Sequence, residues 1–275
     1  MQNPISFMGA NYVCREIGFV VPEGSGGLTG WWGVADQATQ SAFAPIDTYH
    51  ERFDEIVADV AAMGFDHMDV WLAHLNPEWA TDEHVAVALE VLTRHGMKVS
   101  SLAGGFGATR EVFTRSCEIA SALDCGILGG FAPILQTDRR FVLDTLADHG
   151  VKLALENHPE KNPGEVRELI GEPTDGLVGS TLDTGWFGTQ GYDAASAVGE
   201  LADVVFYVHL KDVLAEGAHD SCRFGDGVVP LEATVAALAE IGYAGSFSLE
   251  HEPDDRDPTD DVLASRAMLQ SWIGS

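Results

Sequence analysis

Short, nearly continuous apolar runs alternate along this chain with longer segments in which apolar residues recur at the three- and four-residue spacing of an amphipathic helix. The apolar runs predict eight strands, at residues 5–12, 67–74, 97–107, 126–133, 151–155, 177–186, 204–212 and 245–252. The periodic segments predict eight helices, at residues 47–63, 81–95, 109–123, 137–149, 163–170, 192–201, 230–241 and 258–272. The predicted helices 47–63, 81–95, 137–149 and 230–241 are each followed directly by a glycine, which is where helices commonly end.

Strict alternation of strands and helices favours a parallel sheet, and strands without a polar face are typical of a sheet covered on both sides. Eight such repeats in roughly 250 residues predict a closed (β/α)8 TIM barrel, that is, a single α/β domain over residues 1–275. No Gly-x-Gly-x-x-Gly follows the first strand, which disfavours an open dinucleotide-binding sheet. The Gly- and Trp-rich stretch 24–33 predicts a long connection whose tryptophans either cover a sugar or anchor the loop.

Ionisable side chains stand at or near the ends of the last four predicted strands: Glu156, Asp183, His209 and Glu250. A carboxylate at the end of a buried strand is costly to desolvate unless a positive group pairs with it. In a barrel of this kind the carboxyl ends of the strands form the functional face, so the four groups should line one arc of it. Three carboxylates and an imidazole suit Mn²⁺ best, with Mg²⁺, Co²⁺ or Zn²⁺ as alternatives. Salt bridges and caps without a metal are the other interpretation.

Nearby residues are further candidates for the same face. His158 lies two residues after Glu156 and shares its side of the strand, so it is a second candidate base, unless it caps the turn beside Pro159. Lys211 shares the face of His209 and either binds a substrate oxygen or pairs with Asp212 or Asp183.

Four more residues are assigned by their position in the predicted elements. His74 ends the second strand and could face the substrate, and Arg223, in a loop before a Gly-x-Gly turn, could bind a hydroxyl or lie exposed. Glu252 shares the face of Glu250 and could support it, whereas His251 points outward and is expected to be structural.

Charge and cysteine content narrow the possible partners. The 275 residues include 43 acidic and 15 basic residues, for a net charge of −28 at pH 7, which repels nucleic acid and anionic lipid. No apolar run approaches the ~20 residues that span a bilayer, and the N-terminal residues lack the pattern of a secretory signal. The four cysteines form no Cys-x-x-Cys pair. We therefore expect a cytoplasmic protein with reduced thiols that binds neither nucleic acid nor membranes.

The segments LALENHP, STLDTGW, VHLKD and FGDGVVPLEATVAALAEIGYAGSFSLEHE resemble the xylose-isomerase-like TIM-barrel superfamily, the sugar phosphate isomerase/epimerase family. The resemblance covers nearly the whole barrel and is most specific over residues 151–252. It implies that Glu156, Asp183, His209 and Glu250 bind a divalent metal, and that the two glutamates flank a sugar or cyclitol and move a proton. Dimers and tetramers are common among similar proteins, so a homo-oligomer is compatible with it.

The chemistry that follows is removal of a proton next to a carbonyl, with an enediolate intermediate and return of the proton by an acid on the other face. Glu156, Glu250 and His158 are the candidate catalytic residues, and the product is an isomer or an epimer. The scarcity of basic residues at this face disfavours a phosphorylated substrate.

One residue departs from the family pattern. Ketose epimerases of the family resemble Asp-x-x-His after the sixth strand, but here Asp183 is followed at that spacing by Trp186, whose indole binds substrate without accepting a proton. This departure favours, as the alternative, a lyase or dehydratase that expels a β-leaving group from a 3-keto-glycoside or inosose. An endonuclease-type phosphodiesterase and a non-catalytic binding barrel are weaker alternatives, because the net charge opposes DNA and both glutamates are present.

Overall fold

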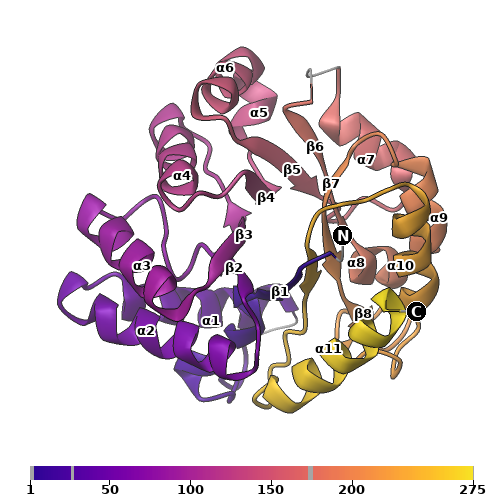
Figure 1. The fold of residues 1–275 in the computed structure, drawn as a ribbon, viewed down its shortest axis with the longest axis horizontal. Helices are drawn as coiled ribbons and strands as arrows, with labels where there is room; N and C mark the ends of the chain where they lie inside the picture. Colours follow the sequence, from indigo (N-terminus) through magenta and orange to yellow (C-terminus); the bar gives the residue numbers. More distant parts are fainter. Residues whose placement is uncertain (1–2, 26–27, 173–175, 275) are drawn as a thin grey trace.

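The chain folds into a closed parallel barrel surrounded by helices (Figure 1). The structure is a computed structural model that describes residues 3–25, 28–172 and 176–274. The barrel strands are β1 (Ile5–Met8), β2 (His67–Trp71), β3 (Lys98–Gly105), β4 (Ile127–Phe131), β5 (Lys152–Glu156), β6 (Val178–Asp183), β7 (Val205–Leu210) and β10 (Phe247–Leu249). They pair in sequence order, and β1 closes the ring against β10. The predicted (β/α)8 fold is confirmed.

The predicted helices are present in the structure, with ends that lie within two residues of the prediction. They are α2 (Ile46–Ala62), α3 (Asp82–His95), α4 (Arg110–Ala122), α6 (Arg139–His149), α7 (Pro163–Ile170), α9 (Ala194–Glu200), α10 (Leu231–Glu240) and α11 (Thr259–Ile273). Side-chain caps fix several of their starts: the Thr81 hydroxyl accepts a hydrogen bond from the backbone N–H of His84, and Asn162 accepts one from Glu165.

Smaller elements lie between these. They are the 3-10 helices η1 (Gly9–Tyr12) and η2 (Arg15–Ile17), the short helices α5 (Ile134–Thr137) and α8 (Thr184–Thr189), and the antiparallel pair β8 (Asp212–Val213) and β9 (Ser221–Cys222). The first and sixth strands are therefore shorter than predicted, because the chain turns into η1 after Met8 and into α8 after Asp183. As a result, Trp186 lies on a helix rather than in a strand.

The prediction of a long connection over 24–33 was wrong for most of that stretch, because helix α1 runs from Leu28 to Phe43; residues 26–27 lie outside the described part. Ala35, Thr39 and Phe43 recur every four residues and are all buried, which gives the helix its inner face. The glycines before and within its first turns, including Gly30 and Gly33, disfavour a helix locally, so packing of this face outweighs low helix propensity.

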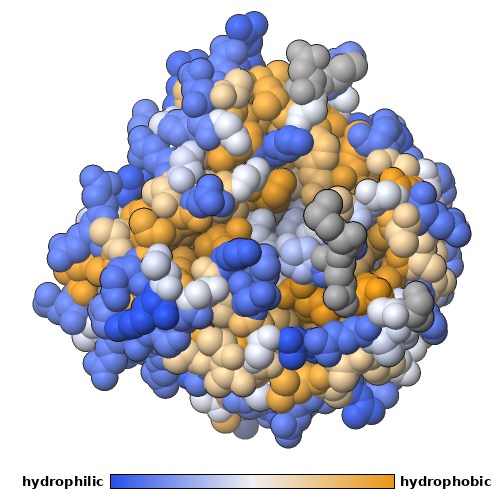
Figure 2. Space-filling model, in the orientation of Figure 1, coloured by the Kyte–Doolittle hydropathy of each residue, from blue (hydrophilic) through white to orange (hydrophobic). Residues whose placement is uncertain are grey.

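Hydrophobic side chains fill the space between the barrel and the helices, while the outer surfaces of the helices are hydrophilic (Figure 2). The core includes Phe7, Met68, Leu102 and Leu153, which point from their strands toward the helices. Within the described ranges, no helix has the length and apolar character needed to cross a membrane.

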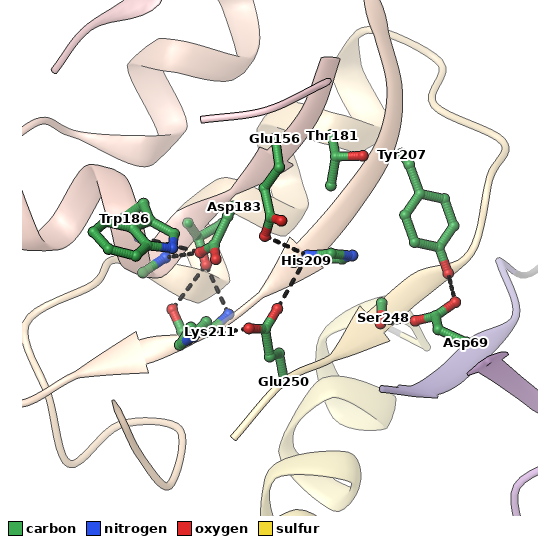
Figure 3. Close-up of polar contacts among 12 residues, drawn as sticks. Asp69, Glu156, Thr181, Asp183, Trp186, Tyr207, His209, Lys211, Ser248 and Glu250 are labelled. Atoms are coloured by element: carbon green, nitrogen blue, oxygen red, sulfur yellow. Dashed lines mark hydrogen bonds and ion pairs between the residues drawn. The ribbon is translucent and has the colours of Figure 1, made fainter. Parts of the chain in front are cut away.

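The interior of the barrel, in contrast, contains a polar layer. Asp69 on β2 is fully buried, and its carboxylate accepts hydrogen bonds from the hydroxyls of Ser6 (3.2 Å) and Ser101 (3.0 Å) as well as from those of Tyr207 and Ser248 (Figure 3). Tyr207 and Ser248 each lie two residues before an ionisable residue at a strand end. This layer therefore forms the floor of the carboxyl-terminal face.

Candidate metal centre

Four adjacent strands bring the predicted ligand residues together. Glu156 ends β5, Asp183 ends β6, His209 is the penultimate residue of β7, and Glu250 directly follows β10. These strands are consecutive around the barrel, and Asp183 is in register with His209. One potential ligand atom from each residue lies within 4.8 Å of the others (Figure 3). The structure thus assembles a possible metal-binding site of three carboxylates and one imidazole.

The imidazole of His209 bridges two of the carboxylates. Its Nδ1 is hydrogen-bonded to Glu156 Oε1 at 2.8 Å and lies 3.0 Å from Glu250 Oε2. Burial alone lowers the pKa of His209, but the carboxylates of Glu156 and Glu250 outweigh it and raise the pKa well above its usual range. Without another cation in the centre, a proton on His209 therefore balances part of the negative charge.

Asp183 is held from both its backbone and its side chain. The side chain of Asn157 accepts a hydrogen bond from the Asp183 N–H (2.7 Å) and donates one to the Asp183 carbonyl (3.0 Å). Asp183 Oδ1 accepts the N–H groups of Gly185 (2.6 Å) and Trp186 (3.1 Å) and so caps α8. Asn157 was missed from the sequence, although its place between Glu156 and His158 turns it toward the neighbouring strand.

Lys211 supplies a permanent positive charge beside the centre. Its Nζ donates to Glu250 Oε1 (2.8 Å) and to Glu252 Oε2 (2.7 Å), and the indole N–H of Trp32 donates to Glu252 (3.3 Å). Burial lowers the pKa of Lys211, but Glu250 and Glu252 outweigh it and raise the pKa well above its usual range. A side chain at Gly185 would collide with the Lys211 stem, since a Cβ there would lie 2.7 Å from it.

The partners of Lys211 differ from those considered in the sequence. Asp212 does not pair with it, because the Asp212 carboxylate accepts the backbone N–H groups of Gly225 (2.9 Å) and Val229 (3.0 Å) and fixes the loop between β9 and α10. The predicted support of Glu250 by Glu252 acts through their shared contact with Lys211.

The four residues fit a divalent cation. Asp183 Oδ2 is fully buried and has no hydrogen-bond partner among the described residues, whereas Glu250 Oε2 has only the ion pair with His209. Buried carboxylate oxygens are nearly always paired, so an unpaired oxygen at a point where three carboxylates converge indicates a position for a ligand of opposite charge. Burial and the nearby Glu250 carboxylate raise the pKa of Asp183 well above its usual range. A bound cation would offset both the cost of burying this charge and the repulsion between the two carboxylates. The donor set suits Mn²⁺, Mg²⁺, Co²⁺ or Zn²⁺.

A cavity of about 360 Å³ opens above this centre and is lined by Glu156, His209, Lys211, Glu250 and Glu252 on its charged side. His158 and Trp186 also line it. The His158 ring stacks edge-on against the Trp186 ring at 4.3 Å, and its Nε2 lies 3.8 Å from Glu156 Oε1. His219, on the connection between β8 and β9, packs on Trp186 from 4.9 Å and was not anticipated.

Two predicted substrate-binding residues are not brought to this cavity. β2 ends at Trp71, and the chain then turns, so His74 is buried between Phe43 and Trp71, where burial lowers its pKa to about 3. Trp71 lines the cavity in its place. Arg223 is partly exposed and forms an ion pair with Asp226 at 3.0 Å.

His251 points away from the site, as expected. Its Nδ1 contacts the Ser221 hydroxyl at 2.9 Å and its Nε2 lies 3.2 Å from Asp261 on α11, so it ties β9 to that helix.

A family model described as "Xylose isomerase-like TIM barrel" matches residues 57–272. No curated protein matches the chain by sequence. Among solved structures, a D-allulose 3-epimerase from Methylomonas sp. in complex with D-allulose is 14% identical, covers 98% of this chain and 96% of its own, and has a TM-score of 0.66.

Two further solved structures show the range of the fold. The probable 3-DHS dehydratase AsbF from Bacillus anthracis is 14% identical over 97% of this chain and 98% of its own, with a TM-score of 0.64. The IOLI protein with a bound zinc atom is 20% identical over 81% of this chain and 92% of its own, with a TM-score of 0.63. At these identities the likeness establishes the fold alone.

The family match is independent of these structural neighbours. It runs from within α2 to within α11 and includes all four residues of the candidate metal centre. The closed eight-stranded parallel barrel described above is the fold that the family description names. The chain therefore belongs to the xylose isomerase-like TIM barrel family.

Proposed function

We propose that this protein is a divalent-metal-dependent enzyme that removes a proton next to the carbonyl of a keto sugar or cyclitol and returns it to give an isomer or epimer. The observation that carries the proposal is the convergence of Glu156, Asp183, His209 and Glu250 at the base of an open cavity, with Asp183 Oδ2 buried and unpaired. A divalent ion held by these four residues would polarise the substrate carbonyl and make the neighbouring C–H more acidic.

The remaining chemistry falls to side chains that line the cavity. Glu156 and Glu250 approach His209 Nδ1 from different strands, so their carboxylates can act as the base and acid of one proton transfer. Burial raises the pKa of Glu156, but His158 and His209 outweigh it and lower the pKa, so Glu156 is ionised and able to accept a proton at neutral pH. His158, close to Glu156, is a second group that can take up that proton.

Lys211 and Trp186 position the substrate in this proposal. Two of the three N–H donors of Lys211 contact Glu250 and Glu252, which leaves one for a substrate oxygen. The Trp186 indole, held between His158 and His219, can cover a sugar ring but cannot carry a proton. The names of the structural neighbours support this class of reaction, since they include epimerases of D-allulose and L-ribulose.

The indole of Trp186 also favours a second candidate, a lyase or dehydratase that uses the same first step and then expels a β-leaving group. In such a reaction the proton need not be returned to carbon on the other face, so a histidine at the position of Trp186 is dispensable. A probable dehydratase among the structural neighbours is compatible with this alternative.

The test is incubation of the Mn²⁺-loaded protein with a panel of keto sugars and inososes in D₂O, followed by NMR and mass spectrometry. Deuterium on carbon in recovered sugar supports the isomerase or epimerase, whereas an unsaturated product supports the lyase. A protein that binds Mn²⁺ at the four residues and yet exchanges no proton in any substrate would refute both.

A further inference from the structure

The two halves of the barrel mouth differ in chemistry. The charged residues of the metal centre stand at or beside the ends of β5, β6, β7 and β10, whereas the side chains that β1 to β4 contribute to the cavity wall carry no charge: Met8, Trp71, Ala103 and Phe131. Glu156, His209 and Glu250 line the same cavity, and the two sets of strands lie on opposite sides of the closed ring. Trp32 of α1 extends the uncharged half.

This uncharged half offers little to a hydroxyl group. The side chains of Met8, Ala103 and Phe131 carry no conventional hydrogen-bond donor, and the indole N–H of Trp32 is already donated to Glu252. The indole N–H of Trp71 is the remaining side-chain donor of this half. A sugar hydroxyl placed against Met8, Ala103 or Phe131 would lose its bonds to water without replacement, which costs about a factor of ten in affinity for each group. A free ketose carries a hydroxyl on each carbon apart from the carbonyl carbon, so only the charged half suits it.

The geometry of the wall fits an apolar ring. Trp32 and Trp71 meet edge to face at 5.6 Å, and Trp71 is almost fully buried, so the wall is rigid. Phe131 at its edge keeps 54% of its surface exposed. The Phe131 ring lies across Gly105, where a Cβ would come within 2.7 Å of it. A large apolar side chain held open at a cavity mouth gains stability when an apolar group covers it.

The cationic groups of the site argue against a phosphorylated substrate. Lys211 is the only Lys or Arg among the described residues that line the cavity, and two carboxylates already surround it. A phosphate would add negative charge beside four carboxylates with no guanidinium or free ammonium to receive it.

From these observations we propose that the substrate is a neutral keto sugar or cyclitol that carries an apolar ring, in the manner of an aryl glycoside. The polar ring lies at the charged half of the mouth, and the aryl group lies against Trp32, Trp71 and Phe131. The assignment of the polar ring rests on the proposed function, whereas the assignment of the aryl group rests on the wall alone.

The experiment measures binding rather than turnover. Matched pairs of methyl and phenyl glycosides of glucose, galactose and xylose, which do not react, are titrated into the Mn²⁺-loaded full chain by calorimetry. We expect the phenyl member of at least one pair to bind ten-fold or more tightly than the methyl member, as burial of an aromatic ring requires. Equal affinities in every pair, or no binding of any member, would overturn the inference.

Two variants locate the effect. Phe131→Asn should reduce the phenyl-to-methyl ratio at least three-fold, and it is expected to fold because the side chain is half exposed. Leu214→Asn is the matched control: Leu214 is 53% exposed but does not line the cavity, so it should leave the ratio unchanged. An unchanged ratio in Phe131→Asn, or an equal fall in both variants, would contradict the placement of the aryl group.

The outcome separates this inference from the proposed function. A phenyl preference in a protein that exchanges no proton in D₂O supports the apolar subsite and refutes only the proposed reaction. Proton exchange without a phenyl preference supports the reaction and refutes only the subsite.

Discussion

Two polar layers lie one above the other inside this barrel, and they treat buried carboxylates in opposite ways. In the lower layer, Asp69 receives hydrogen bonds from four hydroxyls contributed by β1, β3, β7 and β10. In the upper layer, formed by the residues at the ends of β5, β6, β7 and β10, Asp183 keeps one carboxylate oxygen without a hydrogen-bond partner among the described residues. Figure 3 shows the two groups on either side of His209.

The difference teaches where stability and function lie in the structure. A neutral hydroxyl costs much less to desolvate than a charged group, and the four hydroxyls donate to the Asp69 carboxylate. The Asp69 layer is therefore a closed hydrogen-bond network that holds β1, β2, β3, β7 and β10 together. The upper layer crowds like charges and leaves an Asp183 oxygen unpaired, an arrangement that costs stability in the absence of a ligand. The paired carboxylate of Asp69 therefore holds strands together, whereas the unpaired one of Asp183 lies where three carboxylates converge on a possible metal site.

The largest expected effect is on catalysis in the upper layer. Glu156→Gln keeps the shape of the side chain but removes the proposed base, so it should lower the rate of proton exchange by about 10²–10⁴-fold. Exchange is followed by NMR in D₂O with the substrate identified from the panel. A variant that retains more than a tenth of the wild-type rate would remove Glu156 from the mechanism.

The next largest effect is on stability in the lower layer. Asp69→Ala leaves four buried hydroxyls without their acceptor and opens a cavity, so it should destabilise the fold by about 3–5 kcal/mol. At roughly 2–4 °C per kcal/mol, the midpoint of thermal unfolding should fall by about 6–20 °C. Asp69→Asn, which keeps one acceptor oxygen, should lose less. Melting of Asp69→Ala within 2 °C of wild type would show that the layer is not structural.

Metal should stabilise the wild type by a smaller amount. A ligand at one hundred times its dissociation constant stabilises the folded state by about 2.7 kcal/mol, so Mn²⁺ should raise the melting midpoint by several degrees and a chelator should reverse the rise. Asp183→Asn should abolish this response. Without metal the same variant should be within about 1 kcal/mol of wild type, because asparagine also caps a helix and the repulsion with Glu250 is removed. A full metal response in Asp183→Asn would exclude Asp183 as a ligand.

The smallest effect is expected for charges in solvent. Arg140 and Asp144 on α6 form an exposed pair at 2.7 Å, four residues apart on the helix. Arg140→Ala should change the free energy of unfolding by at most about 0.5 kcal/mol and leave the metal response intact. A loss comparable to that of Asp69→Ala would mean that burial is not what separates these regions.

Much of the site was predictable because its signals are local. Glu156, Asp183 and Glu250 each follow an apolar run, and the carboxyl ends of parallel strands must meet at one face, so their approach follows from the fold. His74 shows the limit of that reasoning: the apolar run continues past the true end of β2, and a turn of three residues moves the side chain out of the cavity. Trp71, the last residue of the strand, lines the cavity instead.

Partners that are distant in sequence were not predictable. Lys211 pairs with Glu252 rather than with the adjacent Asp212, because the backbone amides after β9 surround Asp212. Asp69 carries no sequence signal of its four hydroxyl donors, all of which lie more than thirty residues away in the sequence. Helix α1 was missed for a related reason: the packing that stabilises it outweighs the glycines at its start.

The sequence by itself determined the order of strands and helices, the barrel and the four strand-end residues, because apolar periodicity is a property of neighbouring residues and strict alternation of strands and helices favours a parallel barrel. Only the tertiary structure decided which buried atoms are paired and which are left for a ligand, and that one half of the mouth is charged and the other apolar. Those features depend on the closure of β1 against β10, which sets residues from opposite ends of the chain side by side.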